Sequence, residues 1–227
     1  MADQVFPPPQ ILSRCPDWVV CVKPVGLDSE KAFPAQLRSV LGRPVFPVHR
    51  LDQNVGGLMV YALSAPAAEA LSALIRQGLL VKEYVLICHG ALPAPEGRME
   101  DLLWKDVRRN KVFVVDRPRG GVREASLVYR VLRSLGPDET LVRVRLETGR
   151  SHQIRVQFAS RRCPLRGDHK YGARDREKSP ALFSCALSFP WQGAQQTFEL
   201  MPPWADALSV LPSKTIVLDR KSYEGDS

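Results

Sequence analysis

Three short segments, far apart in the sequence, end in side chains that could take part in one reaction. The segment His-Arg-Leu-Asp ends at Asp52 in a glycine-flanked turn, Lys-Glu-Tyr ends at Tyr84, and Gly-Arg-Ser-His-Gln-Ile-Arg ends at Arg155. A nearby cation stabilises the ionised form of a carboxylate, and a planar guanidinium can bind it through two hydrogen bonds. An isolated carboxylate, a phenol and a guanidinium therefore predict one active site, if folding brings the three segments together.

Each of these residues also has a purely structural interpretation. Asp52 could bond its own backbone in a turn, and Tyr84 could be an inward-facing aromatic of a strand. Arg150 and Arg155 could contact phosphates at the surface, and His152 with its neighbour Gln153 could satisfy buried backbone groups. The active-site interpretation depends on the combination of the segments and on no single one of them.

The composition indicates a globular chain. Apolar residues make up 44% and charged residues 25% of the 227 residues, which does not suit wholesale disorder. No apolar run approaches the length of a membrane span, and the N-terminus has no pattern of a secretory signal. We expect no membrane partner, a cytoplasmic location and a monomer. The segments 1–14 and 212–227 are expected to flank one domain at 15–211, the first as an extension and the second as a flexible tail.

Metal and nucleotide chemistry find little support in the motifs. The five cysteines are scattered, without a Cys-x-x-Cys pair, and the four histidines lack the helical spacing of a zinc protease. Glycine-rich loops for dinucleotides or nucleoside triphosphates are missing, as is the Gly-x-Ser-x-Gly turn of serine hydrolases. We expect neither metal nor organic cofactor.

Positive charge favours a polyanionic partner. The formal net charge is +8, and ten lysines and arginines lie between Arg143 and Arg176. A basic surface raises both the affinity and the association rate for nucleic acid, although a solvated face that serves solubility is the alternative.

The order of elements predicts an α+β fold with a mixed, largely antiparallel sheet and flanking helices, because hairpins outnumber crossovers. Helices are expected at 34–41, after a cap at Ser64, from a cap at Ser151 to residue 160, and at 204–211. Strands are expected at 17–23, 57–63, 81–89, 110–115, 124–135, 140–147, 181–189 and 196–200, with an extended segment at 45–52 and a surface loop at 91–97. The strand at 140–147 should carry one charged face.

Five segments in order resemble the RluA-type RNA pseudouridine synthases. They are the opening Lys23-Pro-Val-Gly, His-Arg-Leu-Asp52, Lys-Glu-Tyr84, Gly-Arg-Ser-His-Gln-Ile-Arg155, and Pro-Leu-Arg-Gly-Asp168-His-Lys-Tyr-Gly. The resemblance covers roughly residues 15 to 205. It implies the catalytic fold of that family and the isomerisation of uridine to pseudouridine in ribosomal or transfer RNA, with no cofactor.

The resemblance also implies roles for single residues. Asp52 would either attack C1′ of the ribose or remove the C2′ proton, and Arg155 would keep it ionised. Tyr84 would stack on the uracil and could help to accept the C5 proton. Arg50 would fill the gap left by the extruded nucleotide, and Leu182 would form an apolar wall under the base. Arg150, His152 and Gln153 are expected to bind the substrate as well.

Some positions depart from the family pattern. Val-Gly-Gly at 55–57 replaces the usual Thr-Ser-Gly, Ser184 replaces a histidine, and Gln157-Phe158 replaces His-Leu. These changes bear on substrate choice more than on reaction type, and Asp168 is expected to fix its own loop. A catalytically inactive RNA-binding protein on the same scaffold is the alternative function, and an enzyme acting on a nucleoside or sugar phosphate is another.

Overall fold

The computed structural model describes residues 6–202 and 204, and this part of the chain is built on one mixed sheet of eleven strands. The strand order is β1-β2-β4-β10-β5-β9-β8-β6-β7, with β3 beside β4 and β11 beside β10. Among these pairs only β4 and β10 run parallel. The expected α+β fold with a largely antiparallel sheet is therefore confirmed.

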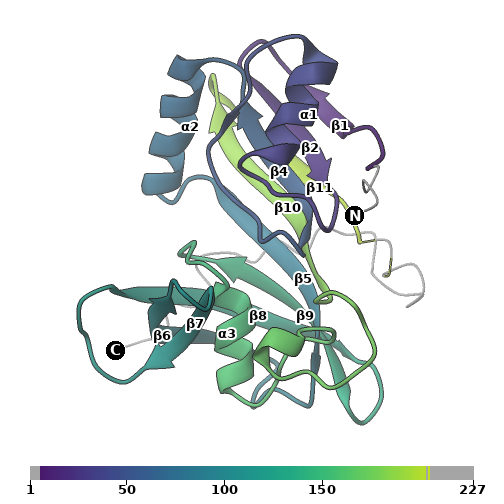
Figure 1. Cartoon of the computed structure of the whole chain (residues 1–227), viewed down its shortest axis with the longest axis vertical. Coiled ribbons are helices and arrows are strands. Elements are labelled where there is room, and N and C mark those ends of the chain that lie inside the picture. The colour runs from purple at the N-terminus through teal and green to yellow at the C-terminus, as the bar shows by residue number, and fades with distance from the viewer. Residues whose placement is uncertain (1–5, 203, 205–227) are drawn as a thin grey trace.

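The sheet forms two halves that the long strand β5 joins (Figure 1). The upper half contains β1 (Gln10–Arg14), β2 (Trp18–Lys23), α1 (Ala32–Leu41), β3 (Phe46–Pro47), β4 (Gly56–Ala62), α2 (Ala65–Arg76), β10 (Leu182–Trp191) and β11 (Ala194–Glu199). The lower half contains β6 (Glu96–Asp106), β7 (Lys111–Val115), β8 (Val122–Ser134), β9 (Glu139–Leu146), α3 (Gln153–Ser160) and the 3-10 turn η1 (His169–Tyr171). Strand β5 (Val81–His89) pairs with β10 of the upper half and β9 of the lower one, so it carries its side chains between the two halves.

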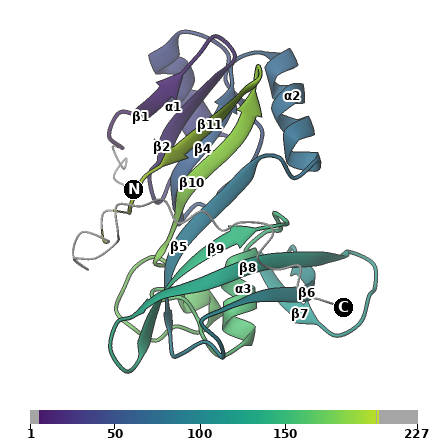
Figure 2. The ribbon, with the colours of Figure 1, turned by 180° about the vertical axis from the view of Figure 1, so that it is seen from behind.

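Helices cover both faces of the sheet (Figures 1 and 2). Phe33 of α1 and Phe158 of α3 share one apolar cluster with alternate residues of β2, β4 and β5, whereas Leu71 of α2 packs with the opposite face of β2 and β4. All seven residues of β4 are buried, because both of its faces are covered. The core therefore holds α1 and α3 against the same face of the sheet.

Most elements lie where the sequence predicts them, and α2 follows its expected cap, since the Ser64 hydroxyl accepts a hydrogen bond from the Ala67 amide at 3.3 Å. Two expectations are wrong. Part of the expected surface loop at 91–97 belongs to the eleven-residue strand β6. Helix α3 begins at Gln153, with His152 and not Ser151 at its cap. Arg143 and Arg145 lie on the same face of β9, as expected, and Arg143 is only 7% exposed.

Two further segments concern the limits of the domain. Residues 10–14, which the sequence places before the catalytic domain, form the edge strand β1 and pair with β2. The helix expected at 204–211 and the tail at 212–227 lie outside the described residues, apart from Trp204.

Candidate active site

A cleft of about 1150 Å³ lies between the two halves of the sheet, and its wall includes every site residue that the sequence predicted. The halves contribute from separate segments: the loop before β4, the strand β5, the start of α3 and the start of β10. The eight residues are Arg50, Asp52, Tyr84, Arg150, His152, Gln153, Arg155 and Leu182. Three segments that are remote in sequence are therefore brought to one site.

Arg155 lies between two carboxylates at the bottom of this cleft. Its Nη1 donates to Oδ2 of Asp52 at 2.9 Å, while its Nε and Nη2 donate to the two oxygens of Asp168 at 2.7 and 2.8 Å. Arg155 is 6% exposed and Asp168 is 1% exposed. Asp168 therefore binds the guanidinium in the bidentate manner, which fixes its plane and directs the remaining nitrogen at Asp52.

The electrostatics of the pair follow from this arrangement. Burial lowers the pKa of Arg155, but the hydrogen bond and charge of Asp168, and then Asp52, outweigh it and raise this pKa above its ordinary value. The guanidinium therefore stays charged at any working pH. Oδ1 of Asp52 makes no hydrogen bond within the described residues, so one oxygen of this carboxylate is left for a substrate.

Tyr84 lies on β5, between Ser184 of β10 and Val144 of β9. It is 4% exposed, and burial first, then the negative charge of Asp52, raises its pKa above the usual range. The phenol therefore remains protonated at neutral pH. Tyr84 lines the cleft together with Asp52, and it presents a protonated phenol there and not a phenolate base.

Buried side chains of the upper half hold the loop that carries Asp52. The ammonium of Lys23 is fully buried and donates to the carbonyl oxygens of Pro24, Leu27 and Gln53 at 2.8, 2.8 and 3.2 Å. The Ser29 hydroxyl donates to the Leu51 carbonyl at 2.9 Å and accepts from the Leu51 amide at 3.2 Å. The residues on both sides of Asp52 are thus fixed to the segment after β2.

His152 connects Asp52 to the lower half. Its backbone is left-handed, with φ at 50°, and this conformation places Nε2 3.9 Å from Oδ2 of Asp52 while Nδ1 lies 2.8 Å from the Tyr171 hydroxyl. Burial lowers the pKa of His152, with Asp52 opposing and Arg155 adding to the effect. The imidazole is therefore neutral at physiological pH and acts as a hydrogen-bonding group.

The other predicted residues differ in how free they are. Gln153 is used within the protein, because its Oε1 accepts from Thr148 Oγ1 and the Arg150 amide, and its Nε2 donates to the Ser126 carbonyl. Arg50 is half exposed and pairs with Glu30 at 2.9 Å. Gln153 thus satisfies backbone groups of the protein, as its structural interpretation predicts. Arg50 lies at the rim of the cleft.

Two cleft residues belong to the quoted motifs but received no role from the sequence. Lys82, on the same face of β5 as Tyr84, has no hydrogen bond or ion pair among the described residues, and burial lowers its pKa. His49 accepts from the Val60 amide at 3.1 Å, while its buried Nδ1 has no partner there. Burial, and then the charge of Lys82, lower the pKa of His49 to about 3. The sequence signals for Lys82 are its place in the Lys-Glu-Tyr segment and its spacing of two residues from Tyr84.

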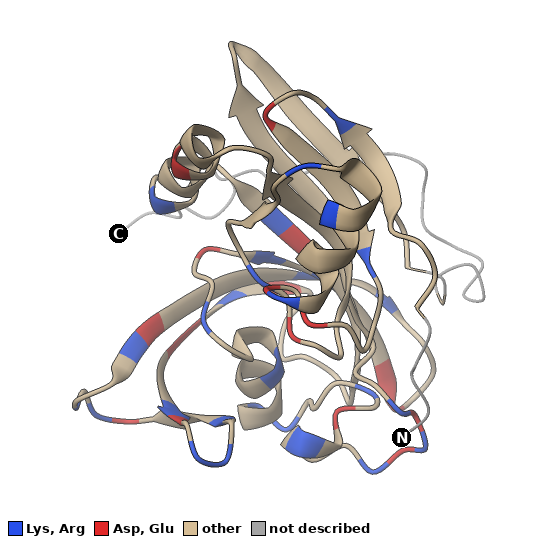
Figure 3. Ribbon diagram, turned by 45° about the horizontal axis from the view of Figure 1, so that its top comes forward, with Lys and Arg blue, Asp and Glu red and all other residues tan. Residues whose placement is uncertain are grey.

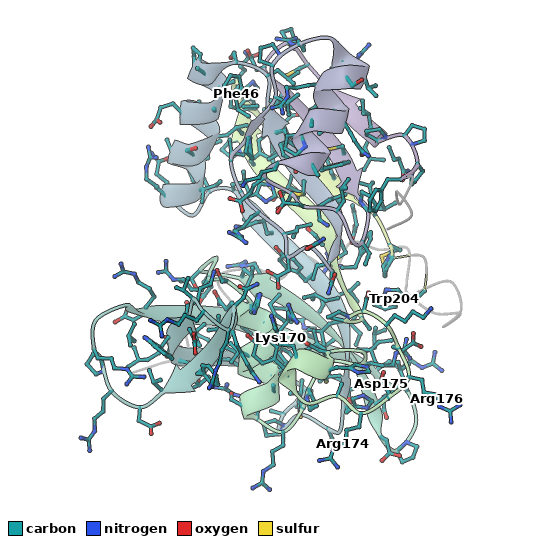
Figure 4. The ribbon with its side chains drawn as sticks, viewed as in Figure 1. Phe46, Lys170, Arg174, Asp175, Arg176 and Trp204 are labelled. Atoms are coloured by element: carbon teal, nitrogen blue, oxygen red, sulfur yellow. The ribbon has the colours of Figure 1, made fainter. Side chains whose placement is uncertain are left out.

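Part of the expected basic stretch is neutralised by ion pairs within the protein. Arg143 pairs with Glu83 and Glu199, and the other pairs are Arg155 with Asp52 and Asp168, Arg161 with Asp101, and Arg166 with Glu139. Lys170 donates to the Asn110 carbonyl at 2.9 Å. Arg174 and Arg176 extend outward at the lower right of the molecule in Figure 4. Four of the ten cations thus serve internal ion pairs and not a free surface.

Neither a metal centre nor a membrane helix is visible in the described residues. They contain no group of three or more histidine, cysteine or acidic side chains placed to hold a metal ion. None of their helices has the length and apolarity to span a bilayer.

Comparison with known proteins gives consistent results. The model of the family described as RNA pseudouridylate synthase matches residues 17–160. The chain is 35% identical to the ribosomal large subunit pseudouridine synthase D of Haemophilus ducreyi over 153 residues, which are 66% of this chain and 46% of that protein. It is 33% identical to an uncharacterized RNA pseudouridine synthase of Bacillus subtilis over 160 residues, which are 69% of this chain and 52% of the other. The chain spans about half the length of the curated relatives it matches.

Solved structures share the fold. Human RNA pseudouridylate synthase domain containing 1 superposes with a TM-score of 0.77 at 20% identity, over 88% of this chain and 86% of that one. Human RNA pseudouridylate synthase domain containing 4 gives 0.73 at 24% identity, over 88% and 91%. This chain therefore shares its overall fold with these proteins.

Proposed function

We propose that this protein isomerises uridine to pseudouridine within an RNA chain. The chain belongs to the RNA pseudouridylate synthase family, which supports this reaction. The observation that carries the proposal is the chain of contacts Asp52–Arg155–Asp168 at the bottom of a cleft that Tyr84 also lines. An ionised carboxylate with one free oxygen is what either route at the ribose requires. The relatives named as ribosomal RNA enzymes support ribosomal RNA as the substrate, with transfer RNA as the other candidate.

The reaction breaks the N1–C1′ bond, turns the uracil, and joins C5 to C1′ with loss of the C5 proton. Asp52 acts on the ribose, either as the nucleophile at C1′ or as the base that removes the C2′ proton. The departing uracil is electron-poor and stays bound, so one carboxylate can serve where hydrolysis of a glycoside uses two. Arg155 donates a hydrogen bond to that carboxylate and places a positive charge beside it.

The remaining cleft residues bind and orient the nucleotide. Tyr84 stacks on the uracil, and the buried Leu182 forms an apolar wall beside it. Arg50 and Arg150 lie at the rim, where a nucleotide must leave its stack before the ribose can be reached. Lys82, a cation without a carboxylate partner among the described residues, suits a polyanion more than a neutral ligand. We infer that the protein acts as a cytoplasmic monomer.

The role of Asp52 is tested by replacing it with asparagine, which keeps the shape and the hydrogen bond from Arg155 but removes the charge. Asp52→Asn should bind uridine-containing RNA within about threefold of the wild-type affinity and form product at least 10³ times more slowly, since a reacting group is lost. Release of tritium from RNA labelled at C5 of uridine measures the product.

The matched control is Asp138→Asn, which changes an exposed carboxylate outside the cleft and should leave the rate unchanged. Product from Asp52→Asn at the wild-type rate would refute the assigned role. RNA binding without product from the wild-type protein on any cellular RNA would favour the inactive RNA-binding protein.

A further inference from the structure

The β6–β7 hairpin and the loop after it carry a dense group of positive charges. Residues 105–123 contain seven lysines and arginines and two aspartates, against a formal charge of +8 for the whole chain. Within residues 6–202, the only ion pair from these seven cations to a carboxylate joins Arg109 to Asp106 at 3.7 Å. Blue segments mark the loops of this part of the lower half in Figure 3. This charge contrasts with the internally paired arginines of the stretch at 143–176.

Aromatic side chains lie between these cations at contact distance. Trp104 of β6 is opposite Phe113 of β7, with ring centroids 6.2 Å apart. The guanidinium of Arg119 lies 4.8 Å from the Trp104 ring, and Nζ of Lys111 lies 5.7 Å from the Phe113 ring and 5.5 Å from the ring of Tyr171. These five residues, Trp104, Lys111, Phe113, Arg119 and Tyr171, form one continuous row, which we term the aromatic–basic track.

The track begins at the catalytic centre. The Tyr171 hydroxyl accepts from the Val112 amide of β7 at 2.9 Å and lies 2.8 Å from Nδ1 of His152, whose other nitrogen faces Asp52. The ring of Tyr171 also lies 5.1 Å from the Arg155 guanidinium. Because β7 ends the strand order of the sheet, no further strand among residues 6–202 pairs with its outer edge. At this edge, Nζ of Lys111 lies near the ring of Phe113 and also near the ring of Tyr171.

We propose that the aromatic–basic track binds single-stranded nucleotides of the substrate RNA that flank the target uridine. This inference rests on the proposed function. Bases of a single strand have free faces that stack on aromatic rings and on guanidinium planes, whereas a duplex keeps these faces covered. Cations spaced between the rings neutralise the phosphates that connect the bases. A row of rings alone would suit many partners, but the accompanying charge matches a phosphate backbone.

The test compares two RNAs with the same central uridine: one of about five nucleotides, and one of about fifteen unstructured nucleotides that reaches along the track. Affinities are measured by fluorescence anisotropy at several salt concentrations, in an Asp52→Asn background so that no turnover interferes. Trp104→Leu should weaken the longer RNA about tenfold by loss of stacking and leave the short one unchanged. Arg119→Gln should reduce the magnitude of the salt slope by about 0.7 for the longer RNA.

Arg174→Gln is the matched control, since it removes an exposed arginine outside the track. Circular dichroism and the thermal midpoint show that each variant is folded. Equal weakening by Arg174→Gln, equal loss for both RNAs, or an equal loss for a duplex of the longer sequence would overturn the proposal.

The two proposals fail in distinguishable ways. If the wild-type protein forms pseudouridine but Trp104→Leu and Arg119→Gln bind the longer RNA normally, only the track is refuted. If the variants lose affinity as described but the wild-type protein forms no product on any RNA, the track remains and the isomerase activity is refuted.

Discussion

Two cations of the site, Lys23 and Arg155, are buried, which is uncommon for charged side chains. Arg155 is shared by two carboxylates, of which only Asp52 lines the cleft, and the fully buried Lys23 supports the loop that carries Asp52. A buried charge destabilises a fold unless hydrogen bonds satisfy it. Three carbonyl acceptors satisfy the Lys23 ammonium, and each of them belongs to the segments that surround Asp52. These residues therefore favour a fixed site over maximal stability.

Lys23 makes the stability depend on pH in a defined direction. Burial lowers its pKa from 10.5 to about 8, with Asp52 and Asp28 opposing the shift. Between these two values the unfolded chain binds more protons than the folded one, so the free energy of unfolding should rise with pH by about 3 kcal/mol from this residue. Below pH 8 both states are protonated and the contribution is flat.

Urea unfolding at pH 7.5 and at pH 10, in the wild type and in Lys23→Met, measures this contribution. The wild-type free energy of unfolding should rise relative to that of the variant, because methionine does not titrate. Parallel pH dependence of the two proteins would contradict the lowered pKa of Lys23.

Strands β4 and β10 approach each other closely at Gly57, where a larger residue would not fit. At Gly57, which has φ at 122°, a methyl group would lie 2.4 Å from the Ser184 carbonyl oxygen of β10. This contact lies where β4 and β10 pair in parallel, next to the loop of Asp52. Both the positive φ and the neighbouring backbone therefore require glycine at this position.

Gly57→Ala should lower the free energy of unfolding by about 3 kcal/mol or more, because neither backbone can move without breaking the β4–β10 pair. Gly42→Ala is the control, since Gly42 also has a positive φ, at 64°, but no atom within 4 Å of the added methyl group. It should cost about 1 kcal/mol from backbone strain alone. Urea titration compares the two, and equal losses would show that the contact with Ser184 has no energetic weight.

The sequence predicted the elements that are determined by neighbouring residues in the chain. The cap at Ser64 and the continuous apolar run of β4 indicate their elements because each is determined by neighbours in sequence. Strand β6 was missed because its residues follow a loop rich in proline and glycine and mix both charges with apolar residues. The left-handed His152 could not be foreseen, since its conformation depends on Tyr171 and Asp52, which are distant in sequence.

The same distinction applies to the site. Asp52, Tyr84 and Arg155 were predicted as one site from their motifs, and the structure places all three in the cleft, although their catalytic roles stay predictions. Asp168 was predicted only to fix its own loop. Its bidentate contact with Arg155 is a tertiary feature that no spacing reveals.

The whole molecule places the cleft where its two halves meet at β5. Behind the cleft, on the other face of this strand, Glu83 of β5 forms a buried ion pair with Arg143 of β9, and Arg143 also binds Glu199 of β11 at 3.0 Å. This network connects strands of both halves. Burial raises the pKa of Glu83, while Arg143 lowers it, so the carboxylate depends on that partner for its charge.

Glu83→Gln should lower the free energy of unfolding by about 2 kcal/mol, because Arg143 then remains buried with Glu199 alone. The matched control is Glu96→Gln, whose ion pair with Arg130 has side chains that are 48% and 34% exposed and should contribute less than about 0.5 kcal/mol. Thermal and urea unfolding measure both variants. A Glu83→Gln protein as stable as the control would mean that the network does not fasten the two halves.

The position of β10 has a consequence for synthesis on the ribosome. This strand lies between β4 and β5 in the sheet, yet it follows them in the chain by about a hundred residues. While residues 182–191 are still inside the exit tunnel, the nascent chain exposes the unpaired edges of two apolar strands. Strand β10 can therefore pair with β4 and β5 only late in translation. Until then the emerging chain can misfold or bind chaperones.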